Sequence, residues 1–294
     1  MKLLSFGEIV WDICGDEKTL GGAPLNLAAH AALQGCDTWL LSAIGKDPLG
    51  KEAVERICKL EIHTEYIDEN SKFPTGQCTV TLDTNRVPSY QLSENAAYDH
   101  IPMPHAFTNT FDMLAFETLA LRSEQNRETL KQVLRKNSFE NIYTDLNIRS
   151  PFYSKEIIDF CLTNATIIKI SEEELPIVTQ QLSGKCLNTV DTSKLIKKNY
   201  PQAKLLLITQ GEKGSLCYDF KTNRVYNCEA VPTNIVSTVG AGDSYGATFL
   251  TWYFRTKDVM LSMTYASKVS AFVVSQQEAI PKDTKEFIKT VVLS

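Results

Sequence analysis

The sequence predicts an α/β fold in which a mostly parallel sheet carries helices on both faces. Two stretches support this, because strand-like and helix-like segments alternate over residues 3–60 and again from Phe111 onwards. Such alternation is typical of parallel strands joined by crossover helices. A third observation is the interruption of this rhythm between residues 64 and 101 by an antiparallel pattern, which predicts a small additional β-layer.

Length and composition restrict the class of protein. The chain has 294 residues, of which 43% are hydrophobic and 22% charged, as in ordinary globular domains. Its net charge of −5 comes without a basic stripe, so we expect no nucleic-acid partner. We also expect no membrane partner, since no apolar run reaches spanning length. Its 8 cysteines include no Cys-x-x-Cys pair, which predicts free thiols and a cytoplasmic protein.

The first predicted strand covers residues 3–6 and ends at Gly7. Asp12 follows between large apolar residues. Its carboxylate either caps a turn or accepts hydrogen bonds from sugar hydroxyls, because a carboxylate accepts from several donors at once.

An alanine-rich helix is predicted next, over residues 25–33, with Pro24 in its first turn. The paired glycines 21 and 22 before it allow a ligand to approach the backbone closely. Asn26 lies in the first turn and offers both a donor and an acceptor. A strand at 38–45 and a helix at 48–60 complete this βαβ unit.

The interruption reads as a hairpin, with alternating segments at 77–83 and 87–92 around a turn at 84–86. It is either a lid over a site or an ordinary edge hairpin.

The α/β alternation then resumes. Strands are expected at 113–116, 141–147, 165–170, 204–209 and 215–219, and helices at 124–136, from 245, and at 259–275. Ser171 and the three glutamates after it predict a capped helix start. Polar residues gather where strands end, at Asp145, Asn147, Arg149, Lys169 and Thr209. Because ligands of open parallel sheets bind beyond the carboxyl ends of the strands, we expect a site at that edge.

A glycine turn precedes the last apolar helices, at residues 240–243. Gly240 and Gly242 free backbone amides to point inwards, and the helix after them favours anions at its N-terminus. Asp243 then either caps the helix or acts as a general base beside a phosphate.

Two segments together resemble a known family. Residues 21–28, followed by 44–50, resemble the N-terminal signature of the ribokinase-like (PfkB) carbohydrate kinases, and residues 238–244 resemble their C-terminal signature. The resemblance spans nearly the whole chain and is nearest to the fructokinases. It implies a three-layer αβα core, formed by 1–9, 21–70 and 104–294, under a small β-sheet lid, formed by 10–20 and 71–103.

The resemblance also implies roles for individual residues. Asp243 is the expected catalytic base, beside the amides of Gly240, Ala241 and Gly242, which face the transferred phosphoryl group. The expected sugar contacts are Asp12, Gly22, Asn26, Asp145 and Arg149. The expected nucleotide contacts are Lys169, Thr209, Gly211 and Gly214. Glu174 is expected to hold Mg²⁺ through a water molecule.

The implied cofactors are Mg²⁺ with ATP, and K⁺, and the implied partners are a sugar and a second copy of the chain joined through the lid. The Ala23–Pro24 pair is similar to fructokinases and favours fructose, with fructose 6-phosphate as product. A 2-keto-3-deoxygluconate kinase, favoured by the Asp145–Arg149 loop, and a nucleoside kinase are alternatives. Ser237 and Ser171 stand where the family usually has Asp and Asn, which leaves a non-catalytic sugar-binding protein as a further alternative.

Overall fold

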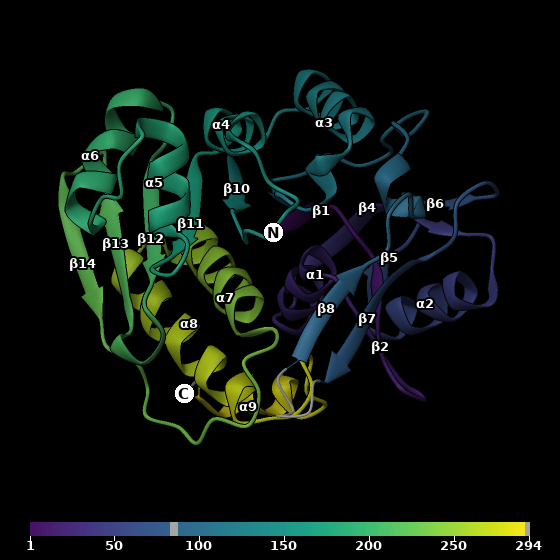
Figure 1. Cartoon of the computed structure of the whole chain (residues 1–294). Coiled ribbons are helices and arrows are strands. Elements are labelled where there is room, and N and C mark those ends of the chain that lie inside the picture. Colours follow the sequence, from purple (N-terminus) through teal and green to yellow (C-terminus); the bar gives the residue numbers. More distant parts are fainter. Residues whose placement is uncertain (83–87, 292–294) are drawn as a thin grey trace.

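The computed structural model describes residues 1–82 and 88–291, and within them it confirms the α/β fold class (Figure 1). The larger sheet has the strand order β14 (Arg224–Cys228), β13 (Ser215–Asp219), β12 (Leu205–Thr209), β11 (Ile167–Ser171), β10 (Asn141–Asp145), β9 (Met113–Glu117), β1 (Lys2–Phe6), β4 (Asp37–Gly45) and β5 (Ile62–His63). A further strand, β6 (Ile67–Asn70), also pairs with β4. From β12 to β5 all neighbours are parallel, whereas β13 and β14 are added antiparallel.

The order of the strands reverses at β1. The chain first moves from β1 to β4 on one side and later returns to place β9 on the other side of β1. In sheets of this kind a crevice forms beyond the carboxyl ends of the strands at the reversal. The site expected at this edge therefore centres on the ends of β1 and β9.

Helices cover both faces of the larger sheet. One face packs against α3 (Glu124–Lys136), α4 (Lys155–Asn164), α5 (Leu175–Ser183) and α6 (Thr189–Asn199). The other face packs against α1 (Ala23–Leu33), α2 (Pro48–Lys59), α7 (Ala241–Thr256) and α8 (Val259–Val274), and α9 (Thr284–Val291) lies on α8. Both faces are apolar because side chains alternate along each strand. In β1, Leu4 and Phe6 pack toward α3–α6, and Leu3 packs toward α1, α7 and α8.

The smaller sheet has four strands in the order β3 (Glu17–Gly21), β2 (Val10–Cys14), β7 (Gly76–Leu82) and β8 (Pro88–Leu92). The expected hairpin is the antiparallel pair β7–β8, and its predicted turn at 84–86 lies outside the described residues. The pairing between β2 and β7 is parallel, so it joins two distant parts of the chain. The division into core and lid, and a dimer through the lid, stay predictions.

One predicted helix start is wrong. Ser171 does not cap α5, because it is the last residue of β11 and the helix is preceded by Glu174 as its N-cap. The Glu174 carboxylate instead turns back and accepts a hydrogen bond of 2.8 Å from the Ser171 backbone N–H. Three short 3₁₀ turns, η1 (Ala97–His100), η2 (Ala120–Arg122) and η3 (Gly211–Lys213), complete the described elements. None of the helices in the described ranges has both the length and the apolar character needed to cross a bilayer.

Gly246 in α7 and Tyr143 in β10 give a test of this packing. A Cβ on Gly246 would lie 2.4 Å from the Tyr143 hydroxyl oxygen, which is buried and has no hydrogen-bond partner among the described residues. We expect Gly246→Ala to lower the free energy of unfolding by about 1–3 kcal/mol, although alanine favours helix. Tyr143→Phe should leave that free energy unchanged or raise it, because it removes an unpartnered hydroxyl.

Urea denaturation of both single variants and of the double variant measures these effects. The cost of Gly246→Ala should shrink in the Tyr143→Phe background, since the clashing oxygen is gone. A stabilising Gly246→Ala would contradict this account of the contact between α7 and β10.

Candidate active site

The glycine turn lies at the start of α7, as predicted. Gly240 is the N-cap and adopts φ 78°, and a Cβ there would lie 2.8 Å from the Cβ of Ala279, so glycine is required. The helix begins at Ala241, and Asp243 is its third residue. Asp243 therefore does not cap α7, which corrects one of the two alternatives for this residue. The residue is 8% exposed, and its carboxylate stands in the first turn, where the helix dipole favours a negative charge.

Asp243 is held by the N-terminal half of the chain. Asn26, in the first turn of α1, donates a hydrogen bond of 2.8 Å from Nδ2 to Asp243 Oδ2. Gly22 is the N-cap of α1 with φ 115°, and a Cβ on it would lie 2.4 Å from the carbonyl oxygen of Glu8. Gly22 thus lets the start of α1 approach the backbone that follows β1, and the expected approach of a ligand to these glycines stays a prediction.

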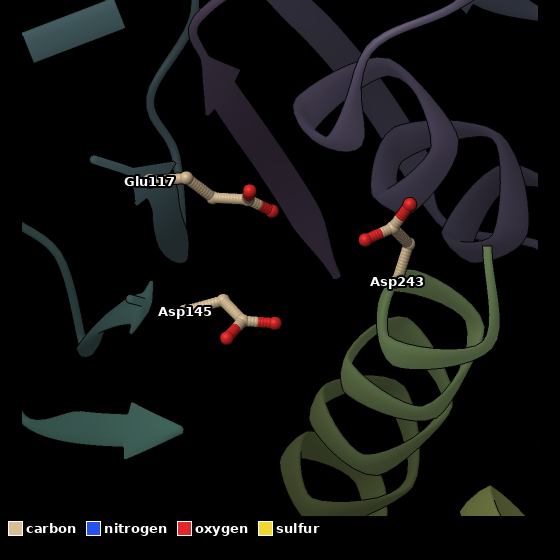
Figure 2. A group of neighbouring side chains, drawn as sticks. All are labelled: Glu117, Asp145 and Asp243. Carbon is tan, nitrogen blue, oxygen red and sulfur yellow. The ribbon is translucent and has the colours of Figure 1, made fainter. Parts of the chain in front are cut away.

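Three carboxylates converge on one space at the ends of β9, β10 and α7 (Figure 2). One oxygen from each of Glu117, Asp145 and Asp243 lies within 4.8 Å of the others. Lys169, on the neighbouring strand β11, donates from Nζ to Asp145 Oδ2 at 2.5 Å. Asn147 donates from Nδ2 to Glu117 Oε2 at 2.6 Å. Residues distant in sequence are therefore gathered at the predicted edge of the sheet.

This cluster is electrostatically crowded. Burial raises the pKa of Asp243 to about 6, the hydrogen bond from Asn26 opposes that rise, and the nearby Asp145 adds to it. Burial, and then the charge of Asp243, raise the pKa of Glu117 well above its usual range. Burial alone would lower the pKa of Lys169, but the Asp145 carboxylate outweighs it and the pKa rises. Two like charges about 5 Å apart repel by roughly 3–4 kcal/mol at a dielectric of about 20. The cluster therefore keeps a proton or attracts a cation.

Two further candidates flank this cluster. Arg149 is exposed in the loop after β10, and its positive charge lowers the pKa of both Asp243 and Asp12. Asp12 lies half-buried on β2 of the smaller sheet, opposite Cys78 on β7. Burial raises the pKa of Asp12, while a hydrogen bond from Cys78 and the charge of Arg149 oppose that rise. Arg149 thus acts on acidic groups of both α7 and the smaller sheet.

The nucleotide candidates lie further along the same edge. Thr209 ends β12, Gly211 opens η3 with φ 57°, and Gly214 follows η3 with φ 98°. A Cβ on Gly214 would lie 2.1 Å from the Cys228 carbonyl oxygen, so only glycine fits. The Glu172 N–H donates to the Thr209 carbonyl at 2.7 Å, which joins this loop to the end of β11. Among the described residues, these three candidates make no hydrogen bond to the carboxylate cluster.

Glu174 is the candidate for a hydrated metal ion. Its two oxygens accept backbone hydrogen bonds of 2.5 Å from Ile148 and 2.8 Å from Ser171. Its charge raises the pKa of Lys169 and of Asp145, so it lies within electrostatic reach of the cluster. A carboxylate that is fixed in this way still has free lone pairs for a water molecule of Mg²⁺. The residues present therefore fit such an ion.

Two site residues were missed from the sequence. Glu117 and Glu8 are each 3% exposed. Glu117 is the last residue of the buried strand β9, and Glu8 follows the glycine that comes after β1. Burial raises the pKa of Glu8 to about 7. An acidic residue at the end of an otherwise apolar strand was the available signal, and it was the same signal that identified Asp145.

Comparisons with known proteins give matches over most of the chain. A family model described as pfkB family carbohydrate kinase matches residues 5–285. An uncharacterized sugar kinase of Pyrococcus horikoshii is 25% identical, over 94% of this chain and 91% of its own. A 5-dehydro-2-deoxygluconokinase of Listeria monocytogenes is 24% identical, over 94% of this chain and 87% of its own. A fructokinase of Klebsiella pneumoniae is 27% identical, over 85% of this chain and 83% of its own.

Solved structures show the same fold. The Pyrococcus horikoshii kinase superposes with a TM-score of 0.81 over 99% of this chain and 97% of its own, at 25% identity. A fructokinase of Vibrio cholerae, solved with fructose, ADP and a calcium ion, superposes with a TM-score of 0.82 over 95% and 94%, at 19% identity.

The buried ion pair gives a test of the site's electrostatics. Lys169→Met should lower the free energy of unfolding by about 3 kcal/mol or more, because it leaves the Asp145 carboxylate uncompensated. Adding Asp145→Asn should recover part of the loss. Urea denaturation of the single and double variants measures this coupling.

Lys213→Met is the matched control, because the ion pair of Lys213 with Glu172 is exposed and should matter far less. Equal losses of unfolding free energy in the two lysine variants would show that the buried ion pair stabilises the fold no more than the exposed one.

Proposed function

The chain belongs to the pfkB family of carbohydrate kinases, and we propose that it transfers the γ-phosphoryl group of ATP to a hydroxyl of a ketose. D-fructose, giving fructose 6-phosphate, is the first candidate substrate. The observation that carries this proposal is the buried Asp243 carboxylate, which lies at an amide-lined helix N-terminus and close to Lys169. An acceptor for a hydroxyl proton and donors for a phosphoryl group are thus side by side.

In this proposal Asp243 takes the proton of the sugar hydroxyl. A pKa of about 6 suits this role, because the group is mostly ionised at neutral pH and still binds a proton readily. Asn26 fixes the orientation of the carboxylate through the bond to Oδ2. The other oxygen is then the one that faces the substrate.

Phosphoryl transfer requires positioning and charge neutralisation more than covalent chemistry. The amides of Gly240 and Gly242 and the Lys169 ammonium would supply fixed positive charge, and a Cβ on Gly242 would lie 3.1 Å from Lys169 Nζ. The Ala241 amide, expected beside them, donates a hydrogen bond of 3.2 Å to the Thr238 carbonyl in this structure. Mg²⁺ bound with ATP would add Lewis-acid stabilisation of the phosphate oxygens, and Glu174 would hold it through water. K⁺ is a further cation in this proposal. Thr209, Gly211 and Gly214 are assigned to the nucleotide.

The sugar is assigned to Asp12, Gly22, Asn26, Asp145 and Arg149. Asp145 is bonded to Lys169 through Oδ2, so it would reach the sugar through Oδ1, which has no partner among the described residues. Asp12 would bring the smaller sheet over the substrate and limit the access of water.

An acidic sugar is the second candidate substrate. The exposed Arg149 could pair with a sugar carboxylate, and one relative is a 5-dehydro-2-deoxygluconokinase. The 2-keto-3-deoxygluconate alternative belongs to the same class. The Klebsiella relative and the fructose-bound Vibrio structure favour fructose instead.

The proposal is tested with purified protein, MgATP and a panel of acceptors, by following ADP release. We expect D-fructose to give the highest kcat/KM in a panel that also contains D-ribose, adenosine and both acidic sugars. A higher value for an acidic sugar would select the second candidate. Binding of a sugar without turnover would indicate a sugar-binding protein and contradict the kinase assignment.

Asp243→Asn tests the base. The variant keeps the shape of the side chain, so it should fold normally but lose about 10²-fold or more in kcat. For the unaltered protein, kcat/KM should fall as the pH drops below about 6, because protonation removes the base. Steady-state rates between pH 5 and pH 9 measure this limb. Near-normal turnover of the variant, or an acid limb that persists in it, would remove Asp243 from this role.

A further inference from the structure

Arg122 stands between the two sheets and is absent from the mechanism above. It ends η2, the short turn that comes after β9 in the chain, and its side chain is 12% exposed. Its guanidinium binds Asp99 of η1 through two parallel hydrogen bonds, from Nε to Oδ1 at 2.7 Å and from Nη2 to Oδ2 at 2.8 Å. Such a planar, two-bond pair is strong and sets a direction as well as a distance.

The same guanidinium is hydrogen-bonded to residues at the end of the smaller sheet. Nη2 also donates to the carbonyl of Ser93 at 2.7 Å and to the Tyr98 hydroxyl at 2.8 Å. Ser93 follows β8 and exchanges backbone and side-chain hydrogen bonds with Gln77 of β7. Tyr98 packs on the start of β7, because a Cβ on Gly76 would lie 2.6 Å from its ring. Both strands of this hairpin are therefore tied to Arg122.

Arg122 also contacts an aromatic residue close to the candidate site. The Cζ atom of Arg122 lies 4.5 Å from the centre of the Phe152 ring and 5.1 Å from that of the Tyr98 ring. The Phe152 N–H in turn donates to the carbonyl of Arg149 at 2.7 Å. Arg122 thus contacts the turn that carries Arg149 as well as the hairpin that pairs with β2.

We propose that Arg122 is a positioning residue for the substrate, which sets Asp12 of the smaller sheet relative to Arg149 of the larger one. Asp12 on β2 is opposite Cys78 on β7, next to the Gln77 that Ser93 holds. A shift of the hairpin would move Asp12, and a shift of Phe152 would move Arg149. This inference rests on the proposed sugar kinase activity.

The chemistry of this position requires arginine. A lysine has the same charge but only one ammonium group, so it cannot bind Asp99 through two parallel bonds while stacking on two aromatic rings. Arg122→Lys therefore keeps the charge and loses the geometry. It is the variant that separates positioning from electrostatic effects.

The experiment compares Arg122→Lys with Arg127→Lys in steady-state kinetics with D-fructose, or with the best acceptor of the panel. Arg127 is a matched control, since it is 15% exposed and bonds the carbonyls of Leu121 and Arg122 from α3. We expect Arg122→Lys to raise the KM for the sugar by about tenfold or more, because small displacements of positioning groups are costly, and to leave the KM for MgATP within about twofold. Arg127→Lys should change neither KM.

A double-mutant cycle that combines Arg122→Lys with Phe152→Leu completes the test. If Arg122 acts on Arg149 through this ring, the double variant should resemble Arg122→Lys alone in sugar KM, and the two effects should not add. Additive effects, an unchanged sugar KM in Arg122→Lys, or equal changes in the two arginine variants would each overturn the proposal. If the unaltered protein phosphorylates no acceptor, the proposed function falls, and this inference falls with it.

Discussion

The site depends on the contact between α1 and α7, two helices from opposite ends of the chain that lie side by side on one face of the sheet (Figure 1). Near their N-termini, Asn26 binds Asp243. At the far end, the Gln34 side chain donates to Thr248 and accepts from the Trp252 indole, so the pair is fixed at both ends. Because both helices start at the carboxyl edge of the sheet, the positive ends of both helix dipoles lie near the carboxylate cluster.

Negative charge is concentrated in that cluster, and the buried Lys169 compensates much of it. Lys169 is bonded to Asp145 and lies against Gly242, so one ammonium group serves the acidic cluster and the amide turn. A phosphate that enters must share this lysine with Asp145. Glu117 has only the neutral amide of Asn147 as its hydrogen-bond partner among the described residues, which agrees with its raised pKa.

Local sequence was sufficient where local chemistry decides the structure. The helix at 124–136 was predicted with its observed bounds, and the glycine turn before α7 was recognised from its residues. The prediction that Ser171 caps a helix was wrong, because a serine followed by glutamates fits a capped helix start but pairing with β12 keeps Ser171 in a strand. Glu117 was missed because its importance depends on which strands become neighbours, and β9 meets β1 across a long stretch of chain. The coupling through Arg122 has the same long-range character.

The parallel pairing of β2 with β7 has a consequence for how the chain emerges from the ribosome. The hairpin of β2 and β3 is made early, but its partner strand follows only after α1, β4 and α2. Until then, one edge of β2 presents unpaired backbone groups, and such edges readily pair with other chains. One face of that hairpin is covered by α2, because the Trp11 ring contacts the cations of Lys18 and Arg56 and its indole N–H donates to the Leu49 carbonyl. Helix α2 can therefore cover the apolar Trp11 side chain before β7 is synthesised, whereas the backbone edge of β2 stays open until β7 pairs with it.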